Sequence, residues 1–221
     1  MVAALDSDPS VALAYCRSWR VNESDEKNGF ADFYLTYLDG SKWTSDYYAD
    51  GREECRDYLI HENTIPNASG VVFRKAIYEG VGGADESLQL CGDWKLWAAM
   101  ALGGKIAYIS EPLNYFRFHE ASLREKSQYE SRDVAERLRV IRWILERVKP
   151  SDAAREKLCE TYSFYWVPAI MSWHVSPDLK RSILNDVRAI DSRALRRALR
   201  PALMTLRLKF ARHFQLARQR S

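Results

Sequence analysis

Short apolar runs separated by polar, glycine-containing stretches characterise the first 120 residues. Residues 10–22 begin with the run VALAY soon after Pro9, and such a run of strand-forming residues next to a turn signal predicts a buried strand. The same reasoning predicts strands at 69–74, 106–109 and 113–118. We therefore expect this half of the chain to contain a sheet.

Helical spacing of apolar residues occurs between the predicted strands. Residues 93–102 carry Trp and Ala side chains at i, i+3, i+4 and i+7, which is the stripe of an amphipathic helix, and a Gly-Gly pair follows it. A short helix is predicted at 50–60 and a helical turn at 75–79. Residues 22–49 are polar and crowded with aromatic side chains, which predicts a long excursion packed onto the body.

The pattern changes after His119, where only helical periodicity remains. Helices are predicted at 124–148, 152–173, 177–190 and 191–220. The last of these places apolar residues on one face and arginines around it. The apolar residues are Leu195, Leu199, Leu203, Leu206, Phe210 and Phe214, and the arginines are Arg196, Arg197, Arg200, Arg207, Arg212 and Arg218.

Charge is divided between the same two parts of the chain. The formal net charge is +3, but residues 1–120 carry 11 Lys or Arg against 19 Asp or Glu, a net of −8. Residues 121–221 carry 22 against 11, a net of +11. We therefore predict an α/β domain over 1–120 and an all-helical C-terminal segment over 121–221 with a basic amphipathic end.

Composition excludes several classes of protein. The 221 residues are 47% hydrophobic and 12% aromatic, which is enough for a packed core and excludes a disordered chain. No uncharged apolar run reaches the about 18 residues that a membrane span needs. The start lacks the basic region of a secretory signal, so we expect a cytoplasmic protein.

The four cysteines predict neither a metal site nor a disulfide framework. Cys16, Cys55, Cys91 and Cys159 lie far apart, with no CxxC pair and no His at the spacing of metal ligands. We expect reduced thiols, mostly in the core.

Five short motifs, in order, carry a resemblance to a known family. They are NTIPNASGVVFR (63–74), VGGADESL (81–88), CGDWKLW (91–97), KIAYI (105–109) and EPLNYFRFH (111–119). Together they resemble the acceptor-side half of family 2 glycosyltransferases of the GT-A fold. The resemblance implies a partial GT-A mixed sheet with flanking helices. It also implies inverting transfer of a sugar from a nucleotide-sugar to an acceptor hydroxyl.

The resemblance places the family's catalytic carboxylate at Asp93. A carboxylate there would take the proton of the attacking hydroxyl, and the start of a helix favours its ionised form. The alternative is structural, because Asp is a preferred N-cap and the predicted helix at 93–102 needs one.

Substrate-binding residues are implied on both sides of Asp93. Asn67, Ser69 and Gly70 match a small-residue loop that meets the donor sugar in the resembled enzymes, and the alternative for them is a plain turn into a strand. Trp94 is a further candidate, because an exposed indole stacks well on a sugar ring, although core packing is the competing interpretation.

The basic end of the last motif is the candidate diphosphate and metal site. Arg117 would face a phosphate in a bidentate manner, and His119 matches a histidine that reaches the metal or the diphosphate in many relatives. Both are also compatible with solvated positions at a strand end.

One part of the family pattern has no counterpart in the chain. The resembled enzymes hold Mg²⁺ or Mn²⁺ with a DxD motif at the end of an N-terminal nucleotide-binding region, and these main metal ligands are absent. A literal DxD at Asp6 and Asp8 precedes Pro9 and is interpreted as a turn. We therefore expect a truncated form, in which a missing N-terminal half or a partner chain covers the exposed sheet edges.

These observations leave more than one functional hypothesis. The first is a glycosyltransferase of polysaccharide biosynthesis that acts on an acceptor glycan or a lipid-linked acceptor. The alternative is a non-catalytic interaction protein derived from such an enzyme, whose basic tail binds a partner.

A third hypothesis places the helix at 191–220 on an anionic membrane surface, at the inner face of the membrane. Nucleic acid is disfavoured because no reading motif accompanies the basic residues. The competing structural interpretation is a helix that packs its Leu and Phe face on the body.

Overall fold

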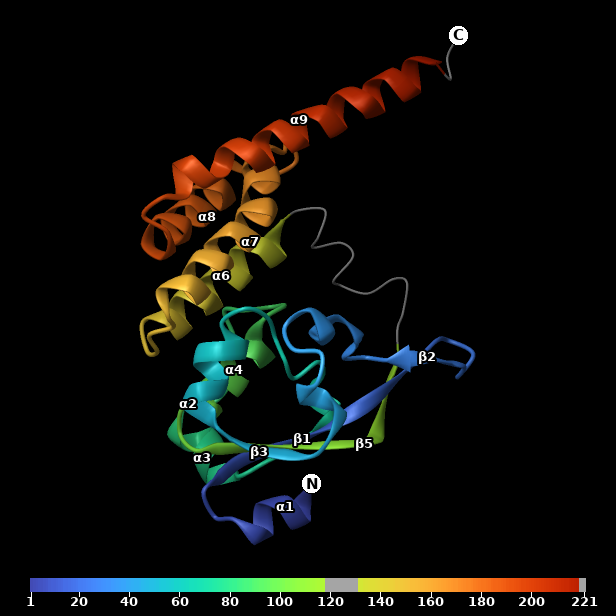
Figure 1. Cartoon of the computed structure of the whole chain (residues 1–221), viewed down its shortest axis with the longest axis vertical. Coiled ribbons are helices and arrows are strands. Elements are labelled where there is room, and N and C mark those ends of the chain that lie inside the picture. Colours follow the sequence, from blue (N-terminus) through green and yellow to red (C-terminus); the bar gives the residue numbers. More distant parts are fainter. Residues whose placement is uncertain (118–130, 219–221) are drawn as a thin grey trace. The chain divides into compact units, whose positions relative to one another are not determined.

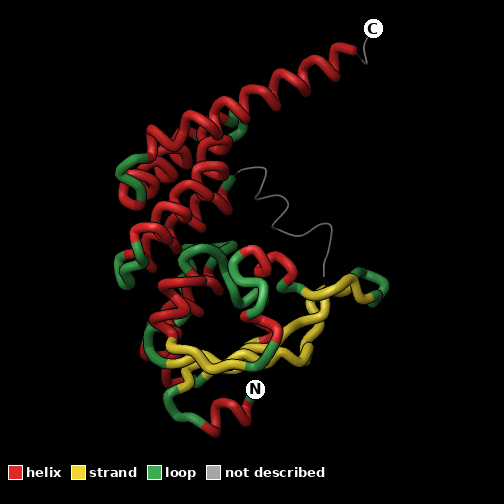
Figure 2. The backbone as a smooth tube through the Cα atoms, viewed as in Figure 1, coloured by secondary structure: helices red, strands yellow, loops and turns green. Residues whose placement is uncertain are grey.

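A computed structural model describes residues 1–117 and 131–218, with side chains up to residue 206 apart from that of Phe33. The described residues form two compact units. The first contains residues 1–117 and Trp143–Pro150, and the second contains 131–142 and 151–218. The first unit is α/β, with a curled mixed sheet and flanking helices, and the second is helical (Figures 1 and 2).

Two parallel strands form the centre of the sheet. β1 (Val11–Val21) pairs in parallel with β5 (Lys105–Arg117), and the order along the sheet is β2-β1-β5-β3. β2 (Lys27–Phe30) and β3 (Tyr47–Asp50) lie at its edges and run antiparallel to their neighbours. β4 (Val71–Phe73) also pairs antiparallel with β1. The sheet is therefore mixed, as the resemblance implies.

Small residues on one face of the sheet allow a short helix to lie against it. Side chains alternate between the two faces of a strand, and Ala14 of β1 and Ala107 of β5 share one face. There they pack with Leu5 of α1 (Val2–Ser7), and Figure 1 shows this helix on the side of the sheet opposite α2 and α4. The apolar run after Pro9 is buried because it is covered on both faces.

Aromatic residues occupy the other face. Tyr15 and Tyr108 follow the two alanines and are buried, and Trp43 donates a hydrogen bond from Nε1 to the Tyr15 Oη at 3.0 Å. Trp43 belongs to a 3-10 turn, η2 (Lys42–Thr44), which follows another, η1 (Phe33–Tyr37). The aromatic excursion predicted at 22–49 is therefore packed onto the body through its rings.

Within residues 1–117, three further short helices follow α1. α2 (Gly51–Glu54) starts at Asp50, whose side chain caps it by accepting from the Arg52 and Glu53 amides at 2.9 and 3.0 Å, and it continues as a π turn, η3 (Cys55–Leu59). These two elements correspond to the helix predicted at 50–60. A 3-10 turn, η4, precedes β4. The remaining bounds are Ala68–Gly70 for η4, Lys75–Gly80 for α3 and Gly92–Ala101 for α4.

Two details of the sheet differ from the prediction. The segments 106–109 and 113–118 were predicted as separate strands, but β5 is continuous from Lys105 to Arg117. Pro112 lies inside it, and the register with β1 shifts there, which accommodates a residue without an N–H group. The excursion was predicted without strands but contains β2 and β3.

Helices of the second part of the chain have the bounds α6 (Arg132–Leu145), α7 (Asp152–Met171), α8 (Pro177–Ile190) and α9 (Ala194–Arg218). Two of them, α7 and α8, begin at the predicted residues. Ser151 accepts a hydrogen bond from the Ala154 amide, and Ser176 accepts one from the Leu179 amide, so α7 and α8 both start at a serine cap. The four predicted helices are therefore confirmed over the residues that the structure describes.

Candidate functional site

Asp93 lies in the first turn of α4 but does not cap it. The helix begins at Gly92, its N-cap is Cys91, and no side chain makes a capping bond there. The half-buried Asp93 carboxylate accepts a hydrogen bond from the Trp94 amide at 2.7 Å. The N-cap interpretation of Asp93 is therefore wrong. This position puts the carboxylate at the positive end of the helix dipole.

The loop before α4 is held by a second carboxylate. Asp85 accepts from the Ser87 amide at 3.0 Å and from its hydroxyl at 2.6 Å, and it pairs with Lys95 at 2.5 Å. The hydrogen bonds from Lys95 and Ser87 hold the pKa of Asp85 well below its usual range. Because Lys95 lies two residues after Asp93, this ion pair fixes the loop to the same turn of the helix.

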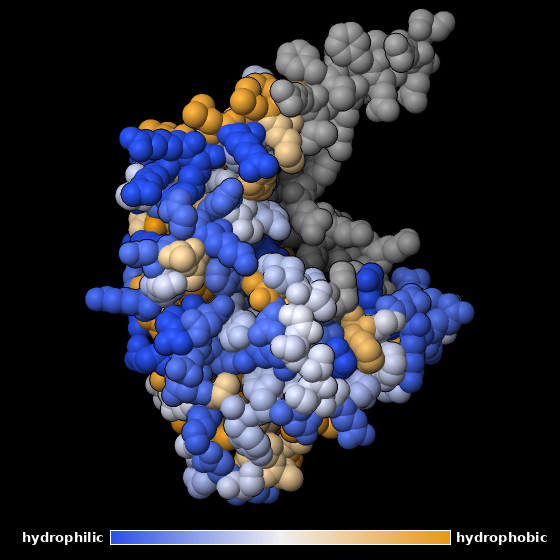
Figure 3. All heavy atoms as spheres, viewed as in Figure 1, coloured by the Kyte–Doolittle hydropathy of each residue, from blue (hydrophilic) through white to orange (hydrophobic). Residues whose placement is uncertain are grey.

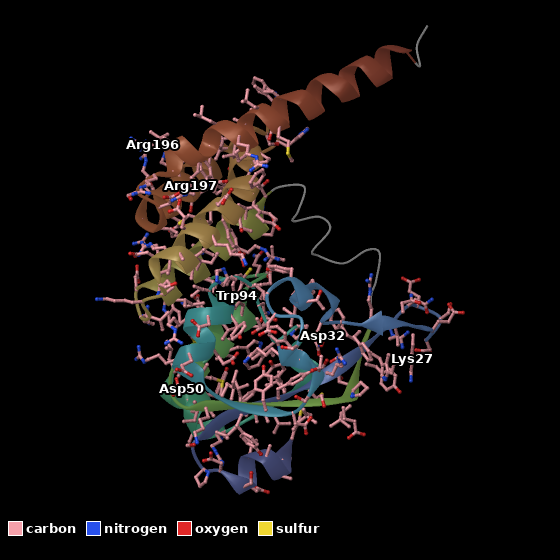
Figure 4. The ribbon with its side chains drawn as sticks, viewed as in Figure 1. Lys27, Asp32, Asp50, Trp94, Arg196 and Arg197 are labelled. Carbon is pink, nitrogen blue, oxygen red and sulfur yellow. The ribbon has the colours of Figure 1, made fainter. Side chains whose placement is uncertain are left out.

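Trp94 is a core residue. Its side chain is 1% exposed, and Nε1 donates a hydrogen bond to the Leu59 carbonyl at 2.9 Å (Figure 4). Trp97 is buried as well, as the helical stripe at 93–102 predicts. Trp94 therefore offers no ring face to a sugar, and the core interpretation of this residue holds.

Asn67, Ser69 and Gly70 come together with two residues of the central strands. Asn67 Nδ2 donates to Ser18 Oγ at 3.0 Å, and Asn114 Nδ2 lies 2.8 Å from Asn67 Oδ1 and 3.0 Å from Ser18 Oγ. The Ser69 hydroxyl and the Gly70 amide both donate to Asn67 Oδ1, at 2.9 and 3.0 Å. We call these five residues the asparagine cluster.

The asparagine cluster is tightly built. A Cβ at Gly70 would lie 3.2 Å from Asn67 Oδ1 and 3.3 Å from Ser18 Oγ, so a larger residue would have to displace them. Ser18 and Asn67 are buried, while Ser69 is exposed at the rim. The cluster therefore presents a polar rim on a rigid base, and hydroxyl and amide groups of this kind form hydrogen bonds with sugar hydroxyls.

Ser18 and Asn114 were not among the predicted site residues. They are register partners on β1 and β5, and each is a polar residue within a predicted strand. The pairing of the two strands was not predictable from local spacing, so no sequence pattern connected the two residues. Asn114 does fall within the last of the five motifs.

A buried ion pair anchors the aromatic excursion. The Glu54 carboxylate, 2% exposed, pairs with Lys42, whose ammonium lies 4.1 Å from the centroid of the Tyr47 ring. Burial raises the pKa of Glu54, although the positive charge of Lys42 opposes the shift. The Tyr47 hydroxyl in turn lies 2.6 Å from that of Tyr15 on β1. This network fixes the excursion to the sheet.

A second buried carboxylate lies near the base of the excursion. Asp32 pairs with Arg17 Nε at 3.1 Å, and its Oδ1 is buried without a hydrogen-bond partner among the described residues (Figure 4). The Tyr108 hydroxyl is 3.5 Å from its other oxygen, and burial raises the pKa of that tyrosine. The burial of Asp32 and Glu54 was not predicted from the sequence, because the ion-pair partner of each carboxylate lies many residues away.

Aromatic rings form a row across three strands. Trp19 of β1 is the register partner of both Phe30 on β2 and Tyr115 on β5, and the first two rings stack with centroids 4.4 Å apart. The exposed Lys27 lies 4.5 Å from the Trp19 ring and 5.4 Å from that of Tyr115 (Figure 4). Tyr115 is 58% exposed, so this row offers a ring face to solvent.

Arg117 stabilises a turn. Its guanidinium donates to the Asn22 carbonyl at 3.0 Å and pairs with Asp25, so it anchors the connection between β1 and β2. In this arrangement its N–H groups are directed at the turn. His119, the predicted metal ligand, lies outside the described residues.

Residues 1–117 and 131–218 contain no group of three or more His, Cys, Asp or Glu side chains arranged to hold a metal ion. Asp8 of the literal DxD accepts from the Ser10 amide at 2.8 Å and from Lys105 Nζ at 3.0 Å, so it forms a turn as predicted.

Comparison with known proteins assigns no family to this chain. No family model matches its sequence, and no curated protein does. The glycosyltransferase hypothesis therefore rests on the five motifs and on the geometry of the residues within them.

Proposed function

We propose that the protein is an inverting glycosyltransferase of the family 2 type with a partial GT-A fold, which transfers a sugar from a nucleotide-sugar donor to an acceptor hydroxyl. The five motifs that support this proposal lie in one compact unit of the chain. They cover η4 and β4, the loop before α4, the start of α4 and most of β5.

The observation that carries the proposal is the Asp93 carboxylate. It is half-buried in the first turn of α4, at the position where the resembled enzymes have their base, and it is not needed as the N-cap. A base there takes the proton of the acceptor hydroxyl while that oxygen attacks the anomeric carbon and the nucleoside diphosphate leaves from the opposite side. The positive end of the helix dipole at this position favours an anion.

The asparagine cluster supports a sugar-binding role for the loop before β4. Its base is fixed by hydrogen bonds to both central strands, so the exposed Ser69 hydroxyl is preorganised. Its proton is donated to Asn67 Oδ1 and it accepts from Asn114, so its oxygen keeps one lone pair that can accept from a sugar hydroxyl. Groups that are already oriented lose little entropy when a ligand binds. The row of rings also includes the exposed Tyr115, and an aromatic ring of this kind stacks on a pyranose.

No step of the transfer is assigned to a metal ion. The resemblance places the acidic ligands in a nucleotide-binding region with no counterpart in the chain, and the described residues supply no substitute set. The contribution that we propose for this chain is proton removal by Asp93 and orientation of the sugars.

The proposal is tested with the full-length product of the gene and a panel of nucleoside diphosphate sugars, with Mg²⁺ or Mn²⁺ and a carbohydrate acceptor mixture. We expect release of nucleoside diphosphate from at least one donor, dependent on the acceptor. If no donor on the panel is bound in calorimetry or turned over, the proposal fails and the non-catalytic interaction protein takes its place.

A further inference from the structure

Leucine side chains are exposed along the first half of α9. Leu195, Leu199, Leu203 and Leu206 are 87, 68, 59 and 42% exposed, respectively. They follow one another at i, i+4, i+8 and i+11, so they form one continuous stripe on the helix. Figure 3 shows apolar side chains gathered along this part of α9. We call these four residues the leucine stripe.

The opposite side of α9 is the one that packs. Ala194 and Pro201 are buried, and Arg197 pairs with Glu156 of α7 and, at 2.8 Å, with Asp191. α9 therefore contacts α7 through small and charged residues and leaves the leucine stripe in solvent. The expectation that this helix packs its Leu face on the body is wrong for the described residues.

Positive charge borders the leucine stripe. Arg196 and Arg200 are exposed beside it, and the ion pair of Arg200 with Glu160 is long, at 3.9 Å, and lies in solvent. From Ser192 to Ser221 the sequence has nine Lys or Arg and no Asp or Glu. Phe210 and Phe214 continue the spacing of the stripe along the sequence.

An apolar stripe beside arginines is complementary to one kind of surface. An anionic bilayer has acyl chains for the leucines and phosphate groups for the arginines at the same interface. In the part of the chain that the structure describes, no helix has both the length and the apolar character to cross a bilayer. An α9 that lies on the bilayer is compatible with this finding.

We propose that α9 binds the protein to anionic membrane surfaces by inserting the leucine stripe between headgroups, with the flanking arginines paired to lipid phosphates. Such binding places the protein beside a lipid-linked molecule, but it is independent of sugar transfer. Vesicle binding therefore tests α9 whether or not Asp93 is a catalytic base.

The test is co-sedimentation of the full chain with vesicles of phosphatidylcholine and phosphatidylglycerol, compared with phosphatidylcholine alone. We expect binding to the anionic vesicles only, weakened by raised salt because the lipid charge is then screened. The double variant Leu199→Ser with Leu203→Ser removes two exposed side chains, so the fold is retained and binding falls roughly tenfold or more. Leu113→Ser, at an exposed position of β5, is the matched control and binds as the wild type does.

Three results would overturn the proposal. In the first, the double variant sediments with anionic vesicles as well as the wild type does. In the second, the wild type does not bind vesicles and elutes as a dimer, whereas the double variant elutes as a monomer. That result would mean that a second copy of the chain covers the leucine stripe. In the third, the chain binds a nucleic acid duplex and not vesicles.

Discussion

At the residue scale, the polar interactions of the first unit are of two kinds, those within one helix and those between distant parts of the chain. The Asp50 cap needs only its own helix, and a first-turn position for Asp93 follows from the helical stripe at 93–102. The burial of Glu54 depends on Lys42, twelve residues away, and on rings from β1 and β3. No pattern in the sequence connects those residues, because the contact exists only once the sheet has formed.

The cysteines give a test of burial at this scale. All four are buried thiols, and burial raises the pKa of Cys55 to about 12 and that of Cys159 to about 11. Because the thiolate is the reactive form, we expect native protein at pH 8 to react with a thiol reagent far more slowly than unfolded protein does. Titration with a chromogenic disulfide, with and without denaturant, measures this. Rapid labelling of Cys55 in the native state would contradict the structure of the α2 region.

At the scale of elements, strong apolar periodicity predicts helices. Segments without a clear apolar pattern are not predicted from the sequence. α8 has the predicted bounds, and β1 begins with the apolar run VALAY that predicts it. β2 is exposed and polar, so its pairing with β1, and not its composition, makes it a strand. Local patterns miss such elements because tertiary contacts decide them.

Close backbone packing between α2 and the end of α4 gives the second test. A Cβ at Gly51 would lie 1.9 Å from the Ala101 carbonyl oxygen and 2.3 Å from that of Gly104, and both are backbone atoms. We expect Gly51→Ala to lower the free energy of unfolding by about 2 kcal/mol or more, since the backbones must separate. Gly40→Ala is the control, because no atom lies within 4 Å of a Cβ at Gly40. We expect it to change the free energy of unfolding by less than about 0.5 kcal/mol. Equal stabilities of the two variants in urea unfolding would show that this contact is absent.

At the scale of the whole molecule, the chain combines two parts with different chemistry. Residues 1–120 are acidic and contain the five motifs, while residues 121–221 are basic and end in α9. The α/β class and the helical end were predictable because periodicity changes sharply after His119. The asparagine cluster and the exposure of the leucine stripe were not, because both depend on which faces pack.

The function proposed for the first part depends on one carboxylate, and its removal is the most direct test. The rate of sugar transfer by the full-length protein should be measured for the wild type, for Asp93→Asn and for Asp50→Asn. Asp50→Asn makes the same chemical change at the start of another helix, where Asn also caps. We predict that Asp93→Asn lowers kcat by about 100-fold or more with donor binding retained, and that Asp50→Asn leaves kcat unchanged. Undiminished transfer by Asp93→Asn would contradict the assignment of Asp93 as the base.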